Sequence, residues 1–227
     1  MTKVFLQFIS IQLEPICYII LSLALLLRLR IKGQRKIRVL LGYYLLSAAG
    51  LSYASWLVFD NLNSGASNNW IYNLLILPAM LAIGYYFHQT FTGKISRHLS
   101  MALVAVNLIY SGLRNLTYTR IIIFDSVGYS LLSISVSMLC FAYFYQLLRN
   151  VNENKLWADF DFWIVSSMLL YFLGGFFIFL FYNILDSNTY EERELLSILW
   201  SVHNVLLFLS SLIMLYGCIW INYRNRS

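Results

Sequence analysis

Residues 162–185 read FWIVSSMLLYFLGGFFIFLFYNIL and contain no Lys, Arg, Asp or Glu. The hydrocarbon core of a bilayer is about 30 Å thick, so a helix needs about 20 consecutive apolar residues to cross it. This stretch meets that requirement, and comparable stretches recur along the chain. Apolar windows predict spans at residues 4–27, 39–59, 70–91, 99–118, 127–148, 162–185 and 195–221. The fourth is the weakest, because Asn107 and Arg114 interrupt it.

The composition of the whole chain agrees with a protein that lives in lipid. Of the 227 residues, 60% are hydrophobic and 11% are charged, and the mean hydropathy is +0.68. A soluble domain carries about a quarter charged residues. The polar connections are too short to bury a core of their own. We therefore expect an all-α polytopic membrane protein, a single bundle of seven transmembrane helices over residues 1–227.

The positions of Lys and Arg predict the orientation, because cationic connections stay on the cytoplasmic side. With the N-terminus outside and the C-terminus in the cytoplasm, the sixteen cations divide twelve to four in favour of the cytoplasm. The outer four are Lys3, Arg114, Arg120 and Arg193. The inner twelve are Arg28, Arg30, Lys32, Arg35, Lys36, Arg38, Lys94, Arg97, Arg149, Lys155, Arg224 and Arg226. Topology and lipid headgroups account for the net charge of +6, so we expect membrane lipid, and no nucleic acid, as a partner.

Polar groups within the hydrocarbon are the candidate functional residues, because each is costly to insert. Glu14 lies about 15 Å below the outer surface at 1.5 Å per residue, and His203 and Asn204 reach about the same depth in the last span. Arg114 and Asn107 lie in the outer half of the fourth span. We predict a shared outward-facing ligand pocket in which Glu14 pairs with Arg114 or His203. The alternative is that these groups are unrelated and each bonds a backbone carbonyl or extends to the interface.

Two cytoplasmic connections are candidates for contacts with lipid or a partner. The first carries Arg28, Arg30, Lys32, Arg35, Lys36 and Arg38 and is suited to anionic lipid or an acidic protein; its alternative role is to fix the topology. The second, residues 150–161, places Trp157 among acidic residues and is a docking candidate, or else a linker that lies on the membrane surface.

The last two spans carry a pattern that extends over about sixty residues. FWIV at 162–165, LYFLGGFFIF at 170–179, Asn183 and LWSVH at 199–203 resemble the final helices of seven-helix membrane modules. These modules occur on bacterial sensor histidine kinases and as small stand-alone proteins. The first five spans match them only in number and length. The resemblance implies a sensing or coupling module in the bacterial cytoplasmic membrane, with His203 as its polar residue. We expect no kinase domain beyond residue 227, and we therefore expect the signal to pass to a separate protein.

Three function classes remain after these observations. We expect a non-enzymatic sensory or accessory subunit that binds a small or lipidic ligand or a partner. The alternative is a small-solute transporter, although Pro15 and Pro78 do not supply the symmetric prolines of carriers built from three, one and three helices. A membrane enzyme is the least favoured, because no His pair has the spacing of a metal site. No catalytic residue, metal or cofactor is predicted.

Overall fold

The computed structural model describes residues 2–29, 34–60, 68–117, 124–149, 157, 159–185 and 190–224. In these ranges the chain forms seven α-helices. They are α1 (Thr2–Leu29), α2 (Arg35–Asp60), α3 (Asn69–Thr90), α4 (Lys94–Thr117), α5 (Ser126–Arg149), α6 (Phe160–Ile184) and α7 (Tyr190–Arg224). The predicted all-α, seven-helix architecture is confirmed. Each helix coincides with one predicted apolar stretch, and their ends differ by five residues or fewer.

Six of the helices are long and apolar enough to cross a membrane, which makes the chain a multi-pass membrane protein by helix length and hydropathy. The apolar segments are Gln12–Leu29, Arg35–Leu57, Asn69–Thr90, Ser126–Arg149, Phe160–Tyr182 and Glu194–Ile221. Helix α4 is not among them. It carries Lys94, Arg97, Asn107 and Arg114, which dilute its apolar residues.

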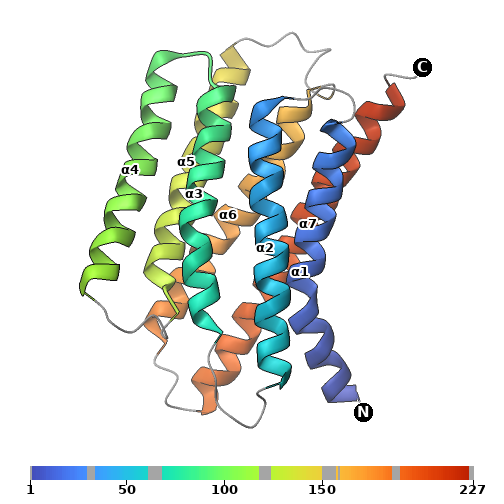
Figure 1. Ribbon diagram of the computed structural model, residues 1–227, viewed down its shortest axis with the longest axis vertical. Helices are drawn as coiled ribbons and strands as arrows, with labels where there is room; N and C mark the ends of the chain where they lie inside the picture. The colour runs from blue at the N-terminus through green and yellow to red at the C-terminus, as the bar shows by residue number, and fades with distance from the viewer. Residues whose placement is uncertain are drawn as a thin grey trace.

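These six helices form a closed ring, and α4 lies outside it. Helix α1 packs against α2 and α7, α2 against α3, α3 against α5, α5 against α6, and α6 against α7. Helix α4 packs against α3 and α5 from the outer side and stands at the edge of the bundle in Figure 1. Neighbours in sequence run in opposite directions, so the two ends of the chain lie at opposite ends of the bundle (Figure 1).

Close contact between α3 and α4 depends on a glycine. A Cβ atom built at Gly84 would overlap Cγ2 of Val104 on α4. The absence of a side chain therefore lets the two helices approach closely, as small residues do at membrane helix interfaces. A hydrogen bond of 2.9 Å from Asn107 Nδ2 to Ser135 Oγ ties α4 to α5.

Aspartates begin two of the ring helices. Asp125 precedes α5, and its Oδ1 accepts the backbone N–H of Gly128 at 2.8 Å. Asp159 precedes α6 and accepts the N–H of Asp161 at 3.0 Å. Both bonds satisfy helix N–H groups that have no partner within the helix.

Candidate functional site

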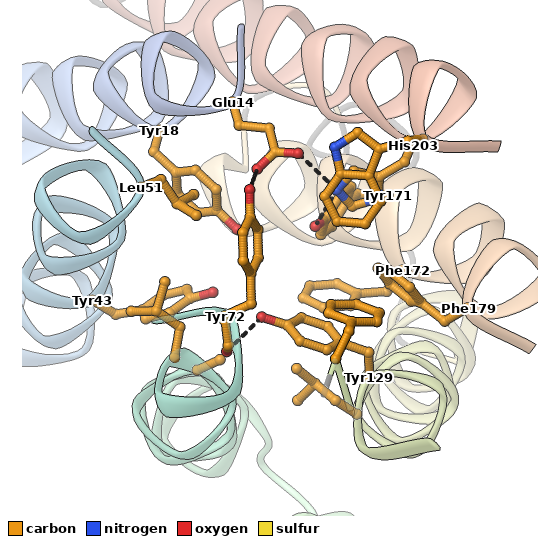
Figure 2. A pocket seen from close by; sticks show the side chains of 15 residues that line it. Glu14, Tyr18, Tyr43, Leu51, Tyr72, Tyr129, Tyr171, Phe172, Phe179 and His203 are labelled. Atoms are coloured by element: carbon orange, nitrogen blue, oxygen red, sulfur yellow. Dashed lines mark hydrogen bonds and ion pairs between the residues drawn. The ribbon is translucent and has the colours of Figure 1, made fainter. Parts of the chain in front are cut away.

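The candidate site is a cavity at the centre of the six-helix ring. The cavity has a volume of about 30 Å³, enough for roughly two water molecules. Every ring helix contributes to its wall, together with Phe124 before α5, whereas α4 does not (Figure 2). The lining residues are Glu14, Tyr18, Tyr43, Leu51, Tyr72, Leu75, Ala79, Phe124, Tyr129, Leu132, Tyr171, Phe172, Phe179, Trp200 and His203.

Glu14, from the middle of α1, is the only carboxyl group that the described residues contribute to this wall. It is 3% exposed, and its Oε2 accepts a hydrogen bond of 2.7 Å from the Tyr72 hydroxyl. The backbone carbonyl of Tyr72 in turn accepts a 2.8 Å bond from the Tyr129 hydroxyl. A chain of hydrogen bonds thus joins α1, α3 and α5 across the ring, as Figure 2 shows.

His203, from α7, is the second ionisable group beside the cavity. It is 4% exposed, and its Nε2 lies 3.9 Å from Glu14 Oε1 and 3.5 Å from the Tyr171 hydroxyl. The imidazole packs against the rings of Tyr171, Phe179 and Trp200. Buried ionisable groups are tolerated in lipid when they face the interior of a bundle and lie near a partner. Glu14 and His203 meet both conditions.

The two oxygens of the Glu14 carboxyl group differ in their hydrogen bonding. Within the described residues, Oε1 makes no hydrogen bond of ordinary geometry, and 3.9 Å exceeds the reach of a direct bond to His203. The indole of Trp200 is the other polar neighbour of this carboxyl group. The arrangement can therefore accept a further hydrogen-bond donor inside the ring.

The predicted site residues are divided among three places. Glu14 and His203 lie together at the cavity, and Asn204 is buried beside His203 on α7 without lining it. Arg114 is instead paired with Asp125, which also accepts a 3.0 Å bond from the Tyr110 hydroxyl. Of the two groups predicted to pair with Glu14, His203 lies beside it, with Nε2 3.9 Å from Oε1. Arg114 does not, because Asp125 at the start of α5 binds that arginine.

Asn107 also lies away from the cavity. Its Nδ2 donates to Leu103 O and to Ser135 Oγ, both at 2.9 Å. These bonds secure α4 against α5, so the position of Asn107 fits a packing role. Whether any of these residues binds a ligand stays a prediction.

Sequence reasoning missed the tyrosines that surround the carboxyl group. Tyr18 follows Glu14 by four residues, and Trp200 precedes His203 by three, spacings that place each pair on one helix face. That signal could have identified both. The contribution of Tyr72 from α3 depends on how the ring closes, and no spacing in the sequence indicates it.

The opposite end of the bundle, where α1 stops and α2 begins, carries most of the predicted lipid and partner contacts; we call it the basic end. Lys36 forms an ion pair with Asp161 and donates to Thr90 Oγ1 at 3.1 Å. The Tyr86 hydroxyl donates to Asp161 Oδ1 at 2.8 Å. The pair therefore links α2, α3 and α6. Lys36 is consequently engaged within the protein.

The other predicted contact residues at the basic end differ in their exposure and in their contacts with the protein. The guanidinium of Arg28 lies 5.1 Å from the centre of the Phe160 ring, while Arg35 and Arg38 are exposed. Trp157 is 57% exposed and packs its inner edge on Phe162 and Trp163. Arg30 and Lys32 lie outside the described residues.

Asp159 gives this end a titratable group. Burial and the neighbouring charge of Asp161 raise the pKa of the Asp159 carboxyl above its ordinary value of 3.8. Its Oδ2 accepts a 3.2 Å bond from the Tyr143 hydroxyl on α5. Two carboxyl groups therefore stand at the start of α6, one of them paired with Lys36.

Within the residues described, no group of three or more His, Cys, Asp or Glu side chains is placed to hold a metal ion. In comparisons of this chain with known proteins, no family model, curated protein or solved structure matches.

Proposed function

We propose that this chain is a non-enzymatic sensory or accessory subunit that binds a small ligand in the central cavity and acts on a separate cytoplasmic protein. The observation that carries the proposal is the placement of Glu14 and His203, 3.9 Å apart, at the centre of a ring of apolar helices. Ionisable groups are expensive in a membrane and are therefore retained mainly for function.

The ring offers a route from the cavity to the basic end. Tyr72 near the start of α3 lines the cavity, and Tyr86 near the end of the same helix bonds Asp161. Helix α6 likewise carries Tyr171 at the cavity and Asp161 at the basic end. A ligand that shifts α3 or α6 at one end therefore changes the relative position of the helices that Lys36 and Asp161 join at the other.

The orientation is part of the same proposal: N-terminus outside, basic end in the bacterial cytoplasm, and α4 as a seventh span. Three features support it. The ends of the chain lie at opposite ends of the bundle (Figure 1). Eight cations in described helices and connections fall at the basic end: Arg28, Arg35, Lys36, Arg38, Lys94, Arg97, Arg149 and Arg224. Helix α4 runs beside α3 and α5 and exposes Val106, Ile109 and Leu113 on its outer face.

Chemical cross-linking in native membranes, followed by purification, tests the coupling. We expect a stoichiometric partner with the wild-type protein and much less of it with Trp157→Ala. Tyr223→Ala is the matched control, because Tyr223 is another exposed aromatic residue at the same end. Glu14→Gln should change the amount of partner recovered without altering the surface of the basic end. Recovery that is indifferent to both Trp157→Ala and Glu14→Gln would refute the proposal.

Transport is the second candidate, because the cavity lies in the interior of the ring, where a path between the helices would run. Uptake of labelled solutes into proteoliposomes distinguishes a transporter from a sensory or accessory subunit. Saturable flux that Glu14→Gln abolishes would establish a carrier, whereas binding without flux, together with a partner, supports the subunit.

A further inference from the structure

We infer that the central cavity binds a small monovalent cation of the ammonium class, ammonium itself or methylammonium, against the carboxylate of Glu14. This inference rests on the proposed function in that it names the ligand class of the same site. It follows from the charge, the aromatic surface and the size of the cavity.

The charge of the wall favours a cation. Among the residues that the structure describes, Glu14 is the only carboxyl group that lines the cavity, and no Lys or Arg of that part of the chain lines it. A carboxylate in a low-dielectric interior requires a proton or a positive partner. Two described cations pair with other carboxyl groups and not with Glu14. Arg114 pairs with Asp125, and Lys36 pairs with Asp161. An N–H donor on a bound cation would meet Glu14 Oε1, the oxygen that lacks an ordinary hydrogen bond.

The aromatic surface points to the same ligand. The wall presents rings from α1, α2, α3, α5, α6 and α7 around one carboxyl group (Figure 2). The face of an aromatic ring carries negative electrostatic potential and attracts ammonium groups within about 6 Å. Tyr72 and Trp200 meet at 5.6 Å between ring centres with their planes at 79°, so the edge of one ring meets the other. The carboxylate in this wall repels an anion.

The size of the cavity limits the cation. The cavity volume of about 30 Å³ corresponds to roughly two water molecules. Ammonium is about the size of water, and methylammonium adds one methyl group. Tetramethylammonium is far bulkier than ammonium and has no N–H group to donate to Glu14 Oε1, the oxygen without an ordinary hydrogen bond. The cavity therefore selects the small members of the class.

Thermal unfolding of the purified protein in mild detergent, at constant ionic strength, tests the inference with chloride salts as probes. Ammonium and methylammonium should raise the Tm progressively with concentration, by about 5–10 °C at a hundred times the half-saturating concentration. Sodium, potassium and tetramethylammonium should leave the Tm unchanged. Equal shifts with all five salts, or no shift with ammonium, overturn the inference.

Variants tie the response to the cavity. Glu14→Gln still accepts the Tyr72 hydrogen bond but lacks the charge, so the half-saturating concentration should rise by about tenfold or more. Glu194→Gln makes the same chemical change at an exposed position of α7 and should keep the half-saturation of the wild type, whatever its own Tm. An ammonium response that survives Glu14→Gln also overturns the inference. If Glu14→Gln does not fold, the comparison of the five salts on the wild-type protein still decides the outcome.

Failure of this inference is distinguishable from failure of the proposed function. If Glu14→Gln alters partner recovery while ammonium has no specific effect on the Tm, the site senses another ligand and the subunit role stands. If ammonium binds through Glu14 but partner recovery ignores both the cation and the variant, the cation site stands and the sensory role fails.

Discussion

The contact between Glu14 and His203 makes a quantitative prediction through a double-mutant cycle. Glu14→Gln retains the 2.7 Å bond from Tyr72 and removes the charge that faces the imidazole. His203→Ala removes that imidazole and also its contacts with Tyr171, Phe179 and Trp200. The cycle cancels those ring contacts, because they are lost equally in both backgrounds. What remains is the coupling between the two groups, for which contacting residues give about 0.5–3 kcal/mol.

Reversible unfolding in mixed detergent micelles, followed by tryptophan fluorescence, measures the four stabilities. We expect the double variant to be more stable than the sum of the single changes by about 1 kcal/mol. Glu14→Gln combined with Arg114→Gln is the matched control. Its two changes should add to within about 0.5 kcal/mol, because Arg114 is paired with Asp125. Additivity of Glu14→Gln and His203→Ala would show that the two groups act independently and would refute the shared site.

Four further predictions concern the rest of the bundle. Asp161→Asn leaves the paired lysine of α2 without its counter-charge and should cost about 1–3 kcal/mol of unfolding free energy, because the pair is mostly buried. The raised pKa of Asp159 means that the folded protein binds the proton more tightly than the unfolded chain. Its contribution to stability is therefore present at acid pH and is lost as the pH rises from the unfolded to the folded pKa; Asp159→Asn, which keeps the helix cap, should flatten a pH series of denaturation midpoints. Gly84→Ala should lower stability by about 1–3 kcal/mol through overlap with Val104, and Val104→Ala should restore it. Gly42→Ala, with no atom within 4 Å of the added methyl group, should raise stability by about 0.5–1 kcal/mol.

The helices could be predicted from the sequence because hydropathy reports directly on what surrounds a segment. The stretch at 162–185 has no charged residue, and α6 coincides with it. Helix α4 was the weakest prediction because polar residues interrupt its apolar stretch. In the structure these polar residues contact α3 and α5, and α4 lies on one side of the bundle. The apolar pattern alone does not reveal that the other six helices close a ring.

The site could be predicted only in part. Glu14 and His203 were identified because ionisable groups within apolar stretches are conspicuous. The prediction that Arg114 could pair with Glu14 was wrong. The sequence shows how deep a residue lies along a helix, but not which way its side chain faces around the helix. Asp125 was overlooked because it lies just beyond a predicted span. The role of Tyr72 depends on which helices become neighbours, and that is decided by packing between distant segments.

The ring closes between α1 and α7, and α1 leaves the ribosome before α7 does. Chains are synthesised from the N-terminus, so Glu14 enters the lipid long before His203 exists. Throughout that interval an acidic side chain stays in the bilayer without its partner, and the ring stays open on one side. A chain that stops before α7 consequently keeps Glu14 in the bilayer without the imidazole of His203 and leaves a gap between α1 and α6.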